Sequence, residues 1–311
     1  MLCRRPILPA LLIVFLLWVA TPAAEKVLYE TQSPYNAIIV TEDERGLRTL
    51  MFERYGARQS VVKIGDPDHI EFPYPKAMLI GLALVEQPKR MLVVGLGGGT
   101  IPSFLHKHYP AVTIDVVDID PEVVRVAKEY FGFRETATMR VHVADGRRFI
   151  EDCREPYDLI FLDAYGATEI PYHLATQQFL VAVRRALSPG GVAVANVWSR
   201  GLNRLYDSMV RTYQSVFDEL YVLDVRGSGN RILFALPRHQ EVRRADLARR
   251  ASAISQEQQF RFDMGRLLAS GFRRPGEVSP RHPILMDKAA TTTATSTQPA
   301  ETRPSIGVLS R

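Results

Sequence analysis

A glycine-rich turn between two apolar segments is the feature that most constrains the fold of this chain. Residues 92–100 read LVVGLGGGT, and residues 116–121 read VVDIDP. Glycines let the backbone turn sharply after a strand and let a ligand approach it closely. An acid about 20 residues further on, at the end of the next strand, can accept hydrogen bonds from ribose hydroxyls. Asp118 and Asp120 both lie there, and Asp118 is the better candidate. The pattern therefore predicts a nucleotide-binding βαβ unit.

The region around this motif alternates strand-like and helix-like segments. Strand-like segments, one alternating at 139–143 and two apolar at 157–162 and 192–197, occur between helix-like patterns at 121–131 and 176–187. Such alternation predicts an α/β fold with a doubly wound sheet, in which ligands bind at the carboxyl ends of the strands. The residues expected at that edge are Gly97, Asp118, Asp145 and Asp163. Taken singly, each acid could also be a helix N-cap or a turn residue.

Several motifs along the chain share one family pattern. They are SPYN at 33–36, the segment 54–59 ending in Gln59, FPYP at 72–75, the glycine motif at 95–100, Asp118, DG at 145–146 and LDA at 162–164. Together they resemble the Rossmann-like transferases that use S-adenosylmethionine, and more narrowly the spermidine synthase (polyamine aminopropyltransferase) family. The resemblance runs from about residue 35 to about residue 237. It implies a Rossmann-like S-adenosylmethionine-dependent transferase fold, preceded by a small N-terminal β-rich domain.

The resemblance also implies roles for particular residues. The cosubstrate would be decarboxylated S-adenosylmethionine or S-adenosylmethionine, without a metal. Its expected contacts are Gln59, Gly95, Gly97, Gly98, Gly99, Asp118, Asp145 and Gly146. Asp163 would begin the catalytic loop and act as the catalytic residue, and Tyr74 would contact a small-molecule amine substrate.

Three departures from the family pattern bear on the amine substrate. Thr100 stands where the glycine motif usually continues with an aspartate, and Gly166 stands where the catalytic loop usually has its second aspartate. The usual tyrosine-histidine-glutamate survives only as Tyr74, followed by a proline and Lys76. Recognition of a cationic polyamine needs carboxylates and aromatic faces. These changes therefore argue against tight diamine binding, for which Glu169 in the following loop is the expected partial compensation.

Three functions stay open on these residues. The preferred one is aminopropyl transfer to an amine, as in polyamine biosynthesis, with Asp163 as the base or orienting group for the attacking amine. The second is methyl transfer from S-adenosylmethionine, which Thr100 favours because the loss of an acid removes a repulsion against the ligand carboxylate. The third is a non-catalytic exported protein that binds a nucleoside or a partner.

The N-terminus predicts export. Arg4 and Arg5 precede an uncharged apolar stretch at 7–20, and small residues at 21–24 offer a cleavage site. This pattern is typical of a secretory signal peptide. The alternative is an uncleaved membrane anchor, although the stretch falls short of the ~20 residues that span a bilayer. In either case the domain would lie outside the cytoplasm, periplasmic or secreted. Such a location conflicts with a cytosolic cosubstrate.

Segment boundaries and composition complete the outline. We expect a leader at 1–24, a small β-rich domain at 25–66, a Rossmann-like nucleoside-binding domain at 67–238, a C-terminal helical segment at 239–288 and a disordered tail at 289–311.

Charge and cysteine content limit the kinds of partner and cross-link that this chain can have. The net charge of +5 would fall to +3 on cleavage, because Arg4 and Arg5 leave with the leader, and this balance indicates no nucleic-acid partner. Cys3 and Cys153 are the two cysteines, so a mature chain would have no internal disulfide. No metal-ligand cluster is expected. Membrane association through the N-terminus and a homodimer stay open.

Overall fold

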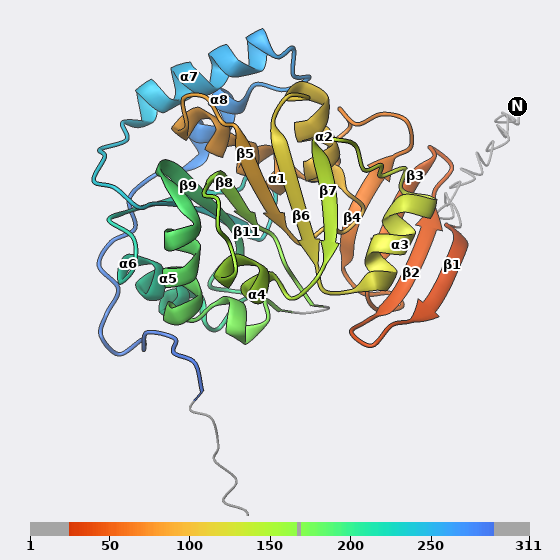
Figure 1. Cartoon of the computed structure of the whole chain (residues 1–311), viewed down its shortest axis with the longest axis horizontal. Helices are drawn as coiled ribbons and strands as arrows, with labels where there is room; N and C mark the ends of the chain where they lie inside the picture. The colour runs from red at the N-terminus through yellow and green to blue at the C-terminus, as the bar shows by residue number, and fades with distance from the viewer. Residues whose placement is uncertain (1–24, 167–168, 289–311) are drawn as a thin grey trace, which may run out of the picture.

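The computed structural model describes residues 25–166 and 169–288 of the 311-residue chain, as two sheets flanked by helices (Figure 1). The expected leader at 1–24 and the expected tail at 289–311 lie outside the described residues. Within the described ranges, every helix is too short or too polar to cross a bilayer.

The N-terminal sheet has four antiparallel strands in sequence order. They are β1 (Lys26–Gln32), β2 (Ala37–Glu42), β3 (Leu47–Met51) and β4 (Arg58–Lys63). The turn between β2 and β3 forms because Gly46 adopts a φ of 72° and the Asp43 carboxylate accepts the Arg45 and Leu47 amides at 2.9 Å each. Alternate side chains of these strands, such as Ile38 and Leu50, are buried against the larger domain.

The central sheet has seven strands in the order β10-β11-β9-β8-β5-β6-β7. These are β5 (Arg90–Val94), β6 (Thr113–Asp118), β7 (Met139–Val143), β8 (Tyr157–Leu162), β9 (Leu187–Trp198), β10 (Glu219–Asp224) and β11 (Asn230–Leu236). Strands β5 to β9 run parallel, and β11 pairs antiparallel with both β9 and β10. This topology confirms the predicted α/β, Rossmann-like fold with a small β-rich unit before it. The strand order reverses at β5, which is where such sheets bind ligands.

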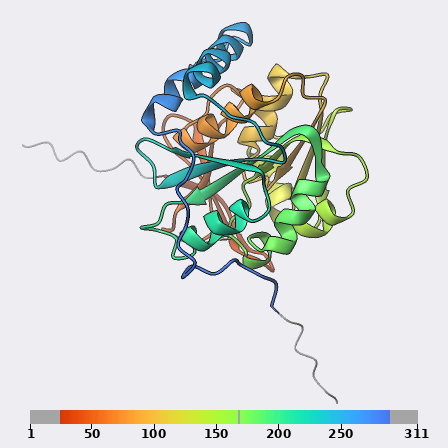
Figure 2. The same cartoon turned by 90° about the vertical axis from the view of Figure 1, so that its left-hand side faces the viewer.

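Helices cover both faces of the central sheet (Figures 1 and 2). One face packs against α1 (Pro73–Met78), η1 (Leu79–Leu84), α2 (Thr100–His108), α3 (Pro121–Tyr130), α7 (Arg244–Glu257) and α8 (Met264–Leu267). The other packs against α4 (Gly146–Glu151), α5 (Gln177–Ala186) and α6 (Tyr206–Gln214). Short 3₁₀ turns lie at η2 (Tyr172–Leu174) and η3 (Leu268–Ser270). The buried apolar residues on both faces hold the carboxyl ends of the strands in place.

Two segments differ from the sequence pattern. Strand β9 begins at Leu187, before the expected start at 192, and its pairing with β8 jumps from Tyr157↔Leu187 to Leu159↔Val192. The SPGG stretch thus bulges out within the strand. Within the expected helical segment at 239–288, the described helices end at residue 270, and the helix is broken between α7 and α8, where Gln259 has a φ of 54°.

After η3 the chain runs back along the molecule in an extended segment. The Leu285 side chain is buried, its carbonyl accepts the Gln177 amide at 2.7 Å, and its amide donates to Thr212 Oγ1 at 2.9 Å. Further on, Asp287 forms a two-pronged ion pair with Arg147, both contacts being 2.7 Å. The C-terminal segment therefore joins α4, α5 and α6 just outside the carboxyl edge of the sheet.

Candidate functional site

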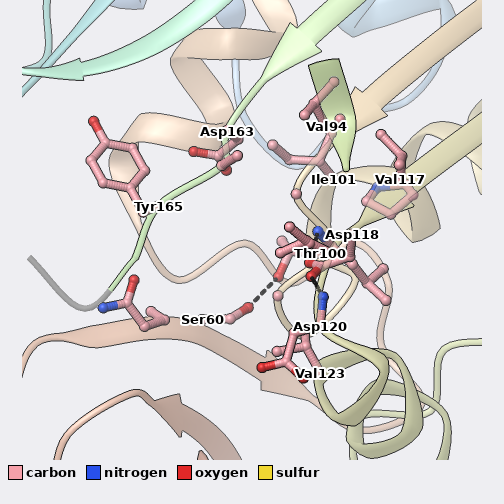
Figure 3. Close-up of a pocket in the computed structure, with 18 of the residues that line it drawn as sticks. Ser60, Val94, Thr100, Ile101, Val117, Asp118, Asp120, Val123, Asp163 and Tyr165 are labelled. Atoms are coloured by element: carbon pink, nitrogen blue, oxygen red, sulfur yellow. Dashed lines mark hydrogen bonds between the residues drawn. The ribbon is translucent and has the colours of Figure 1, made fainter. Parts of the chain in front are cut away.

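A pocket opens at the carboxyl ends of β5, β6 and β8 and is closed on another side by β4 (Figure 3). Asp163 and Tyr165 lie at one end of it, and Asp118 and Asp120 lie at the other. The sequence-predicted residues that line it are Gln59, Tyr74, Gly95, Gly97, Asp118, Asp145, Gly146 and Asp163. The structure thus brings the acids of three successive strand ends and the two N-terminal contacts into one cavity.

Gly98, Gly99 and Glu169 do not belong to the lining that the described residues form. A Cβ at Gly98 would lie 2.9 Å from Ser60 Oγ, and one at Gly99 would lie 2.9 Å from the Phe133 ring. Both glycines therefore let the loop pack closely on its neighbours. Glu169 is exposed, and its carbonyl accepts the Gly166 amide at 2.9 Å.

Asp118 faces the pocket and also shapes the glycine loop. Its Oδ2 accepts the Leu96 amide at 2.8 Å, and its Oδ1 accepts the Asp120 amide at 3.0 Å. Burial raises the pKa of Asp118 to about 6, although the hydrogen bonds from the loop amides oppose this rise. Gly95 is required beside it: its φ is 98°, and a Cβ would lie 2.4 Å from the Asp163 carbonyl.

Asp120, the other acid of this motif, has a structural role. It is 1 % exposed, its Oδ1 caps α3 by accepting the Glu122 amide at 2.9 Å, and its Oδ2 accepts the Ser33 hydroxyl. Both Asp118 oxygens also accept backbone amides, but Asp118 is only partly buried, whereas Asp120 is almost fully buried. This difference in exposure leaves Asp118 as the better candidate for a ligand acceptor.

Asp145 closes a third side of the pocket together with a histidine. Its Oδ1 caps α4 through the Arg148 amide at 3.0 Å, and its Oδ2 lies 2.8 Å from His173 Nε2. Burial acts to raise the pKa of Asp145, but the amide hydrogen bond and His173 outweigh it and lower that pKa. His173 lines the pocket as well. The sequence carries no spacing signal for this histidine, because the loop after β8 is what brings it back.

Asp163 is held by polar side chains in an otherwise buried setting. Asn196 Nδ2 donates to its Oδ1 at 2.8 Å, and the Tyr74 hydroxyl hydrogen bonds with the same carboxyl group. Burial raises the pKa of Asp163 to about 7, against the opposing effect of these two donors. Asn196 is 3 % exposed, and its Oδ1 accepts Asn230 Nδ2 at 2.8 Å. A carboxylate that titrates near neutrality can take up a proton from an attacking amine.

Hydroxyl and aromatic side chains line the part of the pocket where the family pattern has an aspartate at position 100. Thr100 lines the pocket with its hydroxyl oxygen 3.4 Å from Ser60 Oγ (Figure 3). Tyr165 donates to the Asn196 carbonyl at 3.1 Å. Lys76, which was expected near the amine, instead has its ammonium 5.9 Å from the Phe262 ring centroid and is absent from the described lining. The described residues hold no cluster of metal-ligating side chains.

Comparison with known proteins finds a matching family model and a related enzyme. The model of the "Spermine/spermidine synthase domain" family matches residues 71–223. A polyamine aminopropyltransferase of Vibrio vulnificus is 39% identical over 217 residues, which are 68% of this chain and 72% of that protein.

Two solved structures resemble this chain. Human methyltransferase-like protein 13, in complex with SAH, is 36% identical, with a TM-score of 0.56 over 60% of this chain and 93% of that one. A spermidine synthase in complex with the transition state analogue AdoDATO has a TM-score of 0.62 at 22% identity, over 79% of this chain and 84% of that one, and supports the fold alone. The pocket, the fold and the extent of these matches together assign this chain to the spermidine synthase-like family.

Proposed function

We propose that this chain transfers an aminopropyl group from decarboxylated S-adenosylmethionine to an amine. The observation that carries the proposal is Asp163, a carboxyl group with a pKa of about 7 held between Tyr74 and Asn196 at the edge of a nucleoside-sized pocket. The matched aminopropyltransferase of Vibrio vulnificus supports the same choice of reaction.

The chemistry needs an electrophilic carbon beside a proton acceptor. The amine nitrogen attacks the carbon of the aminopropyl group that is bonded to the sulfonium sulfur. The bond between that carbon and sulfur breaks, and its electron pair goes to sulfur. The sulfur leaves as a neutral thioether, methylthioadenosine. The new ammonium then gives a proton to the Asp163 carboxylate. In this arrangement Asp118 would accept the ribose hydroxyls, and Asp145 and Gly146 would border the adenine.

Methyl transfer from S-adenosylmethionine is the second candidate, and one observation favours it. The Thr100–Ser60 pair presents hydroxyls, not a carboxylate, to the pocket. A ligand carboxylate would meet no like charge from these two residues, so the complete amino acid moiety of S-adenosylmethionine is less disfavoured there. The 36% identical methyltransferase-like protein with bound SAH supports this alternative.

A donor assay separates these functions. The purified protein is incubated with a mixture of amines and either donor, and products are read by mass spectrometry. We expect aminopropylated amine and methylthioadenosine from decarboxylated S-adenosylmethionine. Methylated amine from S-adenosylmethionine alone would establish the second candidate. Nucleoside binding in calorimetry without any transfer would establish a binding role. Asp163→Asn is the control that must lose either product.

Restoring the two absent carboxylates tests the expectation that this chain uses diamines poorly. We expect Thr100→Asp combined with Gly166→Asp to raise kcat/KM for putrescine by about tenfold or more, because a hydrogen bond to a charged group is worth ~1.5–3 kcal/mol. Residue 166 can carry a side chain as far as the described residues show, because the nearest of their atoms to a Cβ there is the Glu169 carbonyl oxygen, at 3.5 Å. Gly190→Asp, at an open and exposed turn, adds an acid elsewhere as the control. An unchanged kcat/KM in the double variant would mean that charge recognition is not what limits diamine use.

The N-terminal sequence supports a separate proposal on location. A fusion of residues 1–26 to a reporter that is active only outside the cytoplasm is expected to give signal, because the arginine pair and uncharged stretch direct export. Replacing Leu12 and Leu16 with arginine is the control that should abolish the signal. Native protein recovered from the cytosol with Met1 intact would contradict export. Release into the soluble periplasmic fraction, as opposed to retention with membranes, would distinguish a cleaved leader from an anchor.

A further inference from the structure

A second groove adjoins the nucleoside pocket and leads outward from Asp163. Its wall residues include Arg58, Phe72, Tyr74, Tyr165, Asn196 and Trp198, and it continues over the β10–β11 turn at 227–230. Phe72, Tyr74 and Tyr165 line both the groove and the pocket, so the two are continuous. Tyr74 and Asn196, which hold the Asp163 carboxyl group, form the inner end of the groove. An amine that reaches Asp163 through this groove would have the rest of its structure lying in it.

Four aromatic rings line the groove, together with the polar side chains of Gln59, Asn196, Ser228 and Asn230. Phe72 and Tyr74 stack with ring centroids 6.1 Å apart, and Tyr165 packs on Trp198 at 5.2 Å. These rings come from the start of α1, from the loop after β8 and from the end of β9. The faces of these rings can accommodate a hydrocarbon chain.

Arg58 gives the groove its charge. Among the described residues of the groove wall, Arg58 is the one that is charged at neutral pH. Its guanidinium lies 5.2 Å from the centroid of the Phe72 ring, its side chain is exposed, and within the described ranges it has no ion-pair partner. Arg54, in the loop between β3 and β4, is by contrast paired with Glu30. A cation at the far end of an acceptor would therefore meet Arg58 without a carboxylate to offset it.

We infer that the acceptor is an amine whose far end carries an anionic group, joined to the amine by an apolar chain. The inference rests on the proposed function, because the amine is placed against Asp163. The anionic end would meet Arg58, whose planar guanidinium binds carboxylates and phosphates through paired hydrogen bonds. The apolar chain would lie along the rings of Phe72, Tyr74, Tyr165 and Trp198. This acceptor class differs from a diamine by the sign of one charge.

The test uses acceptors matched in length. With the donor found active above, kcat/KM is measured for 4-aminobutyrate, n-butylamine and putrescine, and for the corresponding six-carbon series. Aminoalkyl phosphates of the same lengths tell a carboxylate acceptor from a phosphate one. We expect the anionic acceptor to exceed the diamine by about tenfold or more, the scale of one charge-assisted hydrogen bond. Arg58→Gln should remove this preference, and Arg58→Glu should reverse it. Arg154→Glu changes the net charge equally, from an exposed residue outside the groove wall, and should leave the ratio unchanged.

Failure of this inference is distinguishable from failure of the proposed function. Transfer to amines with a diamine preference, or with a ratio that Arg58→Glu does not move, overturns the acceptor class and leaves the transferase standing. If no amine is alkylated, the proposed function falls. Calorimetry with 6-aminohexanoate and the methylthioadenosine-loaded protein then tests whether the groove binds an amine with an anionic far end. Binding that Arg58→Glu weakens by about tenfold supports the inference, and absence of binding or an unchanged affinity overturns it.

Discussion

The Asp163→Asn variant is expected to lower kcat by about 10²–10⁴-fold, the usual effect of removing a general base. Asparagine keeps the size of the side chain but cannot take up the amine proton. Affinity for methylthioadenosine should change little, because the expected ribose and adenine contacts lie at Asp118 and Asp145. Single-turnover kinetics and calorimetry on the same preparation separate the two effects. A variant with wild-type kcat would show that Asp163 only supports the loop after β8.

The pH profile gives an independent reading of the same group. Because burial raises the pKa of Asp163 to about 7, the carboxylate is lost as the pH falls through 7, and kcat/KM should decline below that value. The Tyr74 hydroxyl stabilises the charged form, so Tyr74→Phe should move the decline to higher pH. A merely structural role for Tyr74 would lower activity without moving the profile.

The stability of the folded protein should depend on pH in the opposite direction from the activity. The folded-state pKa of Asp163 lies above the ordinary value of 3.8, so the unfolded chain ionises first as the pH rises. The contribution of this carboxyl group to stability is therefore present at low pH and is lost between about pH 4 and pH 7. Asp163→Asn should raise the melting temperature relative to the wild type more at pH 8 than at pH 4. If Asp163→Asn instead melts at a lower temperature than the wild type at pH 8, the charged carboxylate of Asp163 is well solvated in the folded protein.

The parts of the site at strand ends could be predicted from the sequence. Asp118, Asp145 and Asp163 each lie at or just after the end of a strand-like segment, and parallel strands bring their carboxyl ends to one edge of the sheet. Gly98 and Gly99 share the glycine motif but serve packing, which composition alone does not distinguish from ligand contact. Lys76 was misplaced for a geometric reason: it is two residues from Tyr74 in α1, and such residues point to different sides of a helix.

The partners that hold the reactive carboxyl group depend on tertiary contacts. His173 reaches Asp145 only because the loop after β8 turns back, and no periodicity encodes that path. Asn196 did leave a signal: it is a single amide in the apolar run of β9, where a buried polar side chain needs a partner. That partner, Asp163, is 33 residues away and becomes apparent only when β8 and β9 pair. The groove charge at Arg58 likewise appears only when the two sheets meet.

Replacing Asp118 with alanine is expected to weaken methylthioadenosine binding by at least about tenfold. The ribose hydroxyls would lose their hydrogen bonds to the carboxylate, each worth ~1.5–3 kcal/mol for a charged acceptor. The substitution would also remove the 2.8 Å hydrogen bond from the Leu96 amide to Asp118, which holds the glycine loop in place. Because burial raises the pKa of Asp118 to about 6, wild-type affinity should itself fall as the pH drops below 6, and the variant should lack this dependence.

A matched control separates ligand binding from support of the loop. Asp158 also accepts two backbone amides, those of Lys89 at 2.7 Å and Arg90 at 3.1 Å, but it lies at the start of β8, away from the pocket. We therefore expect both Asp158→Ala and Asp118→Ala to lower the melting temperature, whereas the affinity of Asp158→Ala should stay at the wild-type value. Equal affinity in both variants, with folded protein in each, would remove Asp118 from the site. Loss of affinity in Asp118→Ala alone, together with loss of its pH dependence, would identify this carboxylate as the group that binds the ribose.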